Sequence, residues 1–174
     1  GVILNDSNAL YHFCGATRNY ITANDEVNWE NVIYLIGGRS RGYSANCPQG
    51  KLNWKNVRYQ ILTSGGRTDF FNVSRPNLTG TWENVDLIGD GTSYMHFYGT
   101  PSAPMTHEKV TLDIDGGCVF EYCSMIDCTF TPNFQGVFVD RGDNFFKRLN
   151  WNRLRWWIAR GAGTSKFVDP IKPP

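Results

Sequence analysis

The chain has 174 residues and a formal net charge of +1, which fits one domain with a buried core and indicates no charged partner. Aromatic residues make up 14% and charged residues 19%, and there are 18 glycines, a composition typical of a loop-rich β protein rather than a helical one. No apolar run approaches the roughly 18–20 residues that a membrane-spanning helix needs, so we expect no membrane span.

The first 27 residues show no repeat. Residues 5–8 have the composition of a turn, between two short apolar runs. Because the open end of a stacked architecture has to be covered, we interpret residues 1–27 as an N-terminal cap segment.

A short pattern, [NT]-W-[EK]-N-V, then occurs three times, at residues 28–32, 53–57 and 81–85. Each copy runs into an apolar stretch and then into glycine. The tryptophans, 25 and 28 residues apart, are Trp29, Trp54 and Trp82. A period of roughly 20–50 residues is typical of stacked or bladed folds. It predicts that these rings stack in successive layers and that Asn31, Asn56 and Asn84 form an amide ladder.

Residues 110–146 contain short β-type segments with connectors of only one to six residues. Residues 110–115 alternate apolar and polar, the period of a half-buried strand. For residues 144–160 we favour strand, and a helix stays open because no glycine or proline interrupts them.

Residues 108–123, 125–130 and 136–146 resemble rungs of a right-handed parallel β-helix, the architecture of polysaccharide lyases and phage tailspikes. The resemblance implies that the domain at residues 28–165 is all-β, a short right-handed β-solenoid in which each W-[EK]-N-V copy opens a coil. An antiparallel β-sandwich or jelly roll is the alternative, since the short connectors also suit hairpins. Residues 166–174 form an extended proline-rich tail.

The five cysteines are an odd number, and Cys118, Cys123 and Cys128 stand at five-residue steps. Metal sites use C-x2-C or C-x4-C pairs, so we predict no metal and no cofactor. A five-residue step reverses the face of an extended strand. We interpret these cysteines as buried or turn-lining thiols.

Four aspartates are candidates for acid–base chemistry, as in carbohydrate-active β-helices: Asp86, Asp90, Asp113 and Asp115. Aspartate beside glycine is also ordinary turn chemistry, which we favour. No nucleophile motif or phosphate loop occurs, so we name no catalytic residue and lean toward a role without catalysis.

The most unusual local composition is residues 145–160, where basic and aromatic side chains interleave. On a strand, one face carries Trp151, Arg153, Arg155 and Trp157. A final rung with solvated arginines explains this pattern without any ligand. As a binding surface it favours a protein subunit over an acidic glycan, and makes nucleic acid unlikely, because the first 140 residues carry about five net negative charges.

Two sequons, at residues 72–74 and 77–79, flank a turn and weakly favour a secretory route. Residues 141–143 match the Arg-Gly-Asp tripeptide, for which we favour the interpretation of a strand-ending turn.

Together these patterns predict a structural or attachment component of a viral or extracellular assembly that has no enzymatic activity. It would dock to protein subunits, with a homo-oligomer expected, through its basic-aromatic C-terminal third. The alternatives are a carbohydrate-binding or carbohydrate-cleaving β-helix protein and a viral receptor-binding domain on a sandwich fold.

Overall fold

The computed structural model describes residues 3–13, 25–36, 49–62, 77–89, 95–114, 118–131, 137–150, 156–159 and 163–171. These residues form strands and connections, and no helix occurs among them. The strands are β1 (Ile3–Phe13), β2 (Asp25–Ile36), β3 (Gln49–Ile61), β4 (Asn77–Gly89), β5 (Met95–Tyr98), β6 (Met105–Glu108), β7 (Thr111–Ile114), β8 (Cys118–Glu121), β9 (Cys123–Ile126), β10 (Thr129–Phe130), β11 (Val137–Asp140), β12 (Phe145–Lys147), β13 (Trp156–Ala159) and β14 (Lys166–Val168).

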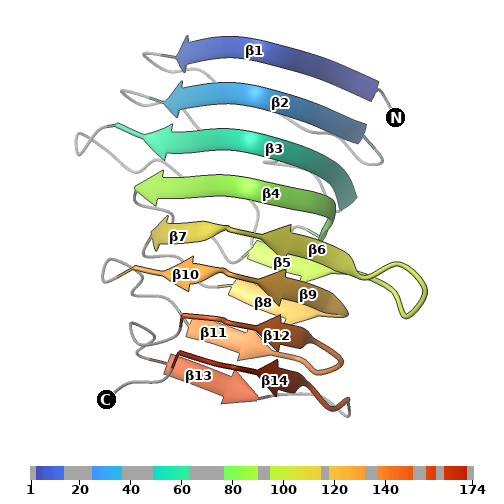
Figure 1. Ribbon diagram of the computed structural model, residues 1–174. Coiled ribbons are helices and arrows are strands. Elements are labelled where there is room, and N and C mark those ends of the chain that lie inside the picture. Colours follow the sequence, from blue (N-terminus) through green and yellow to red (C-terminus); the bar gives the residue numbers. More distant parts are fainter. Residues whose placement is uncertain are drawn as a thin grey trace.

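All of these strands pair in parallel within one sheet that winds into a stack (Figure 1). Parallel neighbours need a crossover connection, whereas a sandwich of short connectors would need antiparallel hairpins. The expected all-β fold and the short β-solenoid are therefore confirmed, and the sandwich alternative is not favoured.

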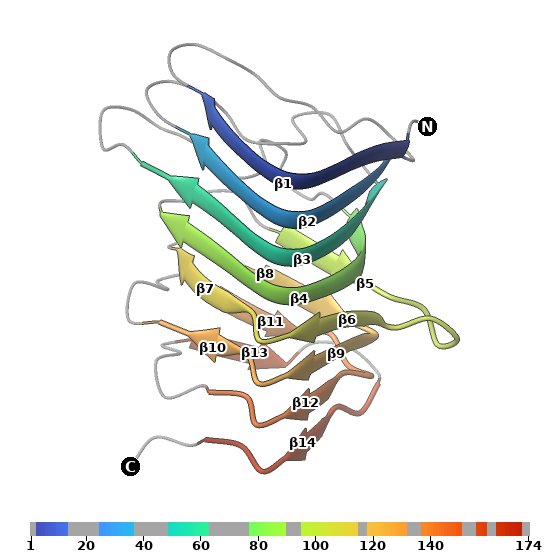
Figure 2. The same cartoon turned by 45° about the horizontal axis from the view of Figure 1, so that its top comes forward.

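The first four strands are long, bent and stacked in register (Figure 2). Below β4 the long strand gives way to two short ones, since both β6 and β7 pair with β4. A second row of strands, β5, β8, β11 and β13, lies behind them and joins the stack through β4. The buried core is built from β2, β3 and β4 in the upper part of the stack and from both rows below them.

The repeated tryptophans lie one above another at the centre of the core. The ring centroids of Trp29 and Trp54 are 4.9 Å apart, as are those of Trp54 and Trp82, and the planes differ by 10° and 4°. This separation equals the spacing of neighbouring strands, so the register itself places the rings in contact. Tyr34 and Tyr59 stack beside them at 4.8 Å. The predicted tryptophan stack is confirmed.

The bend in each level is made by one residue in the left-handed region, with φ between 47° and 55°. The pairing register aligns these residues in one column, called here the αL column: Asn8, Asn31, Asn56, Asn84, Lys109, Asp127, Arg148 and Asp169. Asparagine tolerates this conformation better than most residues because its short amide can bond locally. Each amide donates to the one before it, from Asn84 to Asn56, Asn31 and Asn8, at 2.8, 2.9 and 3.0 Å. The predicted amide ladder is confirmed.

The N-terminal segment contains a further copy of the repeat that the sequence pattern did not reveal. Residues 5–9 pair with residues 28–32, so Asn5 and Asn8 occupy the positions of Asn28 and Asn31. The expectation that this segment shows no repeat is wrong here, because Asp6 replaces the tryptophan that defined the pattern. The proposed division into residues 1–27, 28–165 and 166–174 stays a prediction.

The cysteines at five-residue steps are all buried thiols. The step does not reverse the face, because Tyr122 precedes Cys123 and Asp127 precedes Cys128, both in the left-handed region. Each such residue turns the chain and returns the next side chain to the interior. Burial raises the pKa of Cys128 to about 12, so this thiol stays protonated and packs as an apolar group. Cys14 and Cys47 lie outside the described residues.

Candidate functional site at the C-terminal end

The C-terminal end of the stack is formed by β13 on one row and β14 on the other (Figure 1). Trp157 lies in β13, where its backbone pairs with Phe138 of β11. Of the other predicted binding residues, Trp151, Arg153 and Arg155 lie outside the described residues. The structure therefore places the strand of Trp157 at this end of the molecule and leaves the shared face of the four side chains a prediction.

Two apolar side chains of the last level are exposed. Phe167 packs on Phe146 with ring centroids 5.0 Å apart, yet it stays 40% exposed because no described strand lies beyond it. Ile171 is 46% exposed at the same level. The C-terminal end thus presents the last ring of the core, together with the strand that carries Trp157.

Charged residues replace the amides in the lower half of the αL column. Arg148 donates from Nε and Nη2 to the two carboxylate oxygens of Asp127, at 2.5 and 2.8 Å. This fork holds the pKa of Asp127 below its ordinary value, with further help from the charges of Lys109 and Lys147. The column ends in the exposed carboxylate of Asp169, whose charge adds to that of Asp127 in raising the pKa of Arg148.

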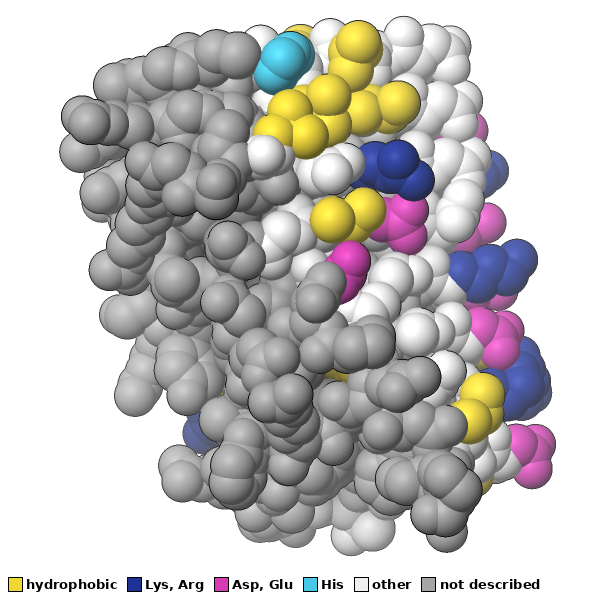
Figure 3. All heavy atoms as spheres, turned by 90° about the vertical axis from the view of Figure 1, so that its left-hand side faces the viewer, with side chains coloured by type: hydrophobic (Ala, Val, Ile, Leu, Met, Phe, Trp, Pro, Cys, Tyr) yellow, Lys and Arg dark blue, Asp and Glu magenta, His cyan; other side chains and the backbone are white. Residues whose placement is uncertain are grey.

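The side of the stack carries further charge pairs between neighbouring levels. The Nζ–Oε1 distances are 3.5 Å for Lys51 and Glu26 and 3.7 Å for Lys55 and Glu30. Figure 3, seen from the left-hand side of Figure 1, shows acidic and basic side chains alternating along its right-hand edge, with hydrophobic side chains gathered near the top. Such exposed pairs contribute at most about 1 kcal/mol each, so they fix register more than they add stability.

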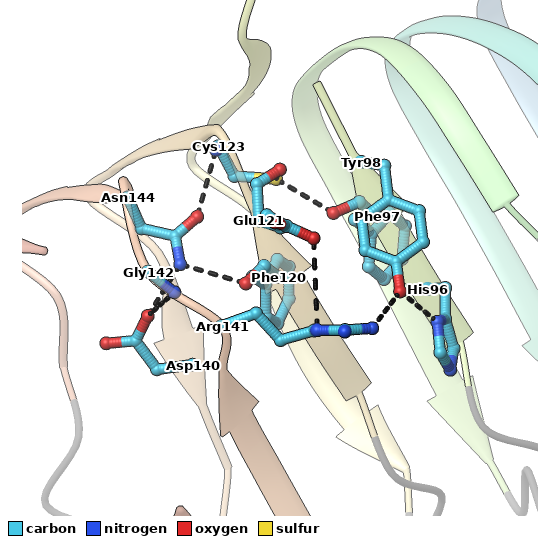
Figure 4. Close-up of polar contacts among 10 residues, drawn as sticks. All are labelled: His96, Phe97, Tyr98, Phe120, Glu121, Cys123, Asp140, Arg141, Gly142 and Asn144. Atoms are coloured by element: carbon cyan, nitrogen blue, oxygen red, sulfur yellow. Dashed lines mark hydrogen bonds and ion pairs between the residues drawn. The ribbon is translucent and has the colours of Figure 1, made fainter. Parts of the chain in front are cut away.

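A polar cluster lies at the ends of β5, β8 and β11 (Figure 4). Arg141 donates from Nη1 to the hydroxyl of Tyr98 at 2.8 Å, and this hydroxyl lies 2.7 Å from Nδ1 of His96. The Arg141 Nε atom lies 3.8 Å from the Glu121 carboxylate. Sequence analysis did not group these residues, because positions on three separate strands have no linear spacing that would reveal them.

The Arg-Gly-Asp tripeptide belongs to the turn after β11, as the strand-ending interpretation predicts. Gly142 adopts a φ of 104° and Asp143 one of 55°. Arg141 is held on Tyr98, and the Asp143 carboxylate lies so close to Gly163 that an added Cβ there would be 2.0 Å from it. Two of the three residues are therefore engaged within the chain.

The same turn is fixed by a buried carboxylate (Figure 4). Oδ1 of Asp140 accepts hydrogen bonds from the Gly142 amide and the Asn144 side chain, at 2.9 and 2.7 Å. It also accepts one from the Ser165 hydroxyl, at 2.8 Å. Asn144 also bonds the backbone on both sides of the β8–β9 corner. A buried carboxylate satisfied in this way holds the last two coils together.

Of the candidate acid–base aspartates, the structure describes Asp86 and Asp113, and each has a partner on another strand or segment. Asp86 lies 3.7 Å from the guanidinium of Arg58, and Asp113 accepts a hydrogen bond from Thr131. Asp90 and Asp115 lie outside the described residues. Of the sequons, Asn77 begins β4 and pairs with β3 and β5, and residue 72 lies outside the described ranges.

Within the described ranges, no group of three or more His, Cys, Asp or Glu could hold a metal ion. Nor does any helix there have the length and apolar character to cross a membrane. His107 is fully buried against Trp82 and Phe97, and burial lowers its pKa to about 3, so it packs as a neutral ring. A shallow depression of about 350 Å³ lies over the first three strands, lined by Asn5, Asn28, Asn53, Glu30 and Lys55 among others.

The stacked parallel strands define the protein as a short β-solenoid built from an imperfect repeat. Comparison of the chain with protein-family models, with curated proteins and with solved structures finds no match.

Proposed function

We propose that the protein is a structural or attachment component of a virion or an extracellular assembly, without enzymatic activity. It docks to a partner subunit through the C-terminal end of the solenoid. Trp151, Arg153, Arg155 and Trp157 form the basic-aromatic part of that surface.

The exposure of Phe167 carries this proposal. Phe167 continues the core column that begins with the tryptophans, and 40% of its surface stays open at the last level. An exposed aromatic ring in line with a core column offers an apolar surface that a further layer can cover. Because Trp157 lies on the terminal strand of the other row, a partner covering Phe167 would meet both rows.

The rest of the fold suits a scaffold. Ring stacks inside and amide or charge pairs outside join several neighbouring levels in addition to the strand pairing, which favours a stiff stack. A partner at one end is therefore held at a fixed distance from whatever binds the other end.

The test changes Arg153 and Arg155 together to alanine and measures self-association by sedimentation and folding by thermal unfolding. The matched control changes Lys51 and Lys55, two exposed lysines on the side of the stack, to alanine. We expect the arginine variant alone to lose association while both variants keep the melting temperature of the original chain. Equal loss of folding in the arginine variant would place these residues in the core and overturn the proposal.

Carbohydrate binding or cleavage is the second candidate. The depression over the first three strands supports it, because amides, a carboxylate and an ammonium group suit sugar hydroxyls. A glycan array and a reducing-sugar assay separate the two candidates. Binding that is lost in Asn28→Ala, or sugar release, would favour this role over the assembly role.

A further inference from the structure

The outer column that begins with Leu10 has apolar side chains toward its two ends and polar ones in the middle. In register order its members are Leu10, Ile33, Arg58, Asp86, Thr111, Thr129, Asn150 and Ile171. Leu10 is 66% exposed on β1, and Ile171 is 46% exposed beyond β14. Ile33, next to Leu10 in the column, is also aliphatic and 44% exposed, whereas the members from Arg58 to Asn150 are polar. The apolar side chains of this column therefore lie at or next to its open ends, where another apolar surface can meet them.

The αL column also has complementary ends. Asn31 donates to Oδ1 of Asn8, so the amide chain runs toward β1 and the N–H groups of Asn8 are its last donors. At the other end the column finishes in the exposed Asp169, which is an acceptor. The two residues have φ values of 51° and 47°, so both end strands bend at the same position.

Both end strands have an open edge within the described part of the chain, since β1 pairs only with β2 and β14 only with β12. An open strand edge is a template for another strand, and a bent edge accepts only a strand with the same bend. Placing a second β1 beyond β14 with Asn8 opposite Asp169 brings Leu10 opposite Ile171 and Asn5 opposite Lys166. This single placement aligns the bends of the two strands and brings together one apolar pair and two polar pairs of side chains.

We propose that a second copy of the chain docks head to tail, with its β1 continuing the stack beyond β14 of the first. This inference rests on the proposed assembly role and names the surface that homotypic assembly uses. Such a contact joins different surfaces of the two copies, so it produces chains of subunits rather than a closed dimer.

One pair in this joint is mismatched. Asp6 would lie opposite Phe167, and its carboxylate points inward, where the hydroxyl of Tyr11 hydrogen-bonds it. An inward-pointing charge on an edge strand opposes the addition of another strand. The joint is therefore weak and reversible, and Asp6→Asn should tighten it.

The test uses charge exchange in the full chain, followed by sedimentation. Asn8→Asp places two carboxylates opposite each other and should weaken self-association by about fivefold. Asp169→Lys should restore it when that variant is mixed with the Asn8→Asp chain, giving mixed oligomers. Lysine already adopts this conformation at Lys109 in the same column, so the second variant keeps the bend. Gln60→Glu, which adds the same charge in the middle of the stack, is the matched control and should change nothing.

A second pair of variants tests the apolar contact. Leu10→Asn should weaken association by about tenfold, and Leu62→Asn, at an equally apolar but central exposed position, should leave it unchanged. Melting temperatures show that each variant folds. If association is unchanged in the Asn8→Asp and Leu10→Asn variants but is lost when Arg153 and Arg155 are changed to alanine, the head-to-tail joint is overturned. The proposed function would then still stand. A chain that stays monomeric at every concentration would overturn both.

Discussion

The guanidinium of Arg148 donates two hydrogen bonds to the carboxylate of Asp127 in the αL column. Higher in the same column, the amide of Asn56 donates to the amide of Asn31. Both pairs join residues with φ values near 50° on neighbouring levels. The fold thus places bent residues one above another, and two different chemistries join such neighbours within the column.

The fork between Asp127 and Arg148 predicts a pH dependence. Because the pKa of Asp127 is lowered in the fold, its contribution to stability is present above the ordinary pKa of about 3.9 and disappears as the pH falls through the lowered value. Arg148→Ala should raise the pKa of Asp127 toward the ordinary value, as an NMR titration would measure. A pKa that stays unchanged would show that the surrounding lysines, and not the fork, set it.

Trp54 lies between two parallel indoles and should contribute more to stability than any single surface residue. Trp54→Ala removes both ring contacts and leaves a cavity, and should lower the free energy of unfolding by about 3–5 kcal/mol. Urea denaturation measures this. Lys55→Ala, on the exposed neighbouring position, should stay within about 0.5 kcal/mol. Similar losses in the two variants would contradict the importance of the stack.

Asn56 combines two contributions that substitutions can separate. Asn56→Ala loses the amide ladder and meets the left-handed conformation with a Cβ, at a cost of about 1–2 kcal/mol for the conformation alone. Asn56→Gly loses only the ladder, so it should unfold at a higher urea concentration than the alanine variant. The opposite order would mean that the ladder, and not the backbone conformation, selects asparagine here.

His107 should make the core sensitive to acid. Because burial lowers its pKa to about 3, the unfolded chain binds a proton at higher pH than the folded one does. Stability should therefore fall as the pH drops from about 6.5, the ordinary pKa of histidine, toward 3. His107→Phe should remove this part of the pH dependence while keeping the ring contact with Trp82. Urea midpoints at pH 7 and pH 5 test it, and an equal drop in both proteins would contradict it.

Much of the fold could be predicted from three copies of one pattern. The tryptophans and asparagines recur at nearly equal spacing, and side chains at equivalent points of stacked strands must meet their counterparts. The copy at Asn5 and Asn8 escaped notice because Asp6 ends the ring column at the open edge. The binding residues Trp151, Arg153 and Arg155 stay predictions, since composition alone proposed them.

The sequence by itself determined the β character, the stack and the residues that face its interior, because these follow from local periodicity and from a repeat that returns after a fixed length. Only the tertiary structure decided where the columns end, which charges replace the amides, and that His96, Tyr98 and Arg141 meet. The reason is that pairing between levels depends on how many residues each connection uses. The coil length falls from 28 residues between Trp54 and Trp82 to 18 residues between His107 and Met125. Each change in coil length changes which residues pair between levels, and local sequence patterns do not predict that change.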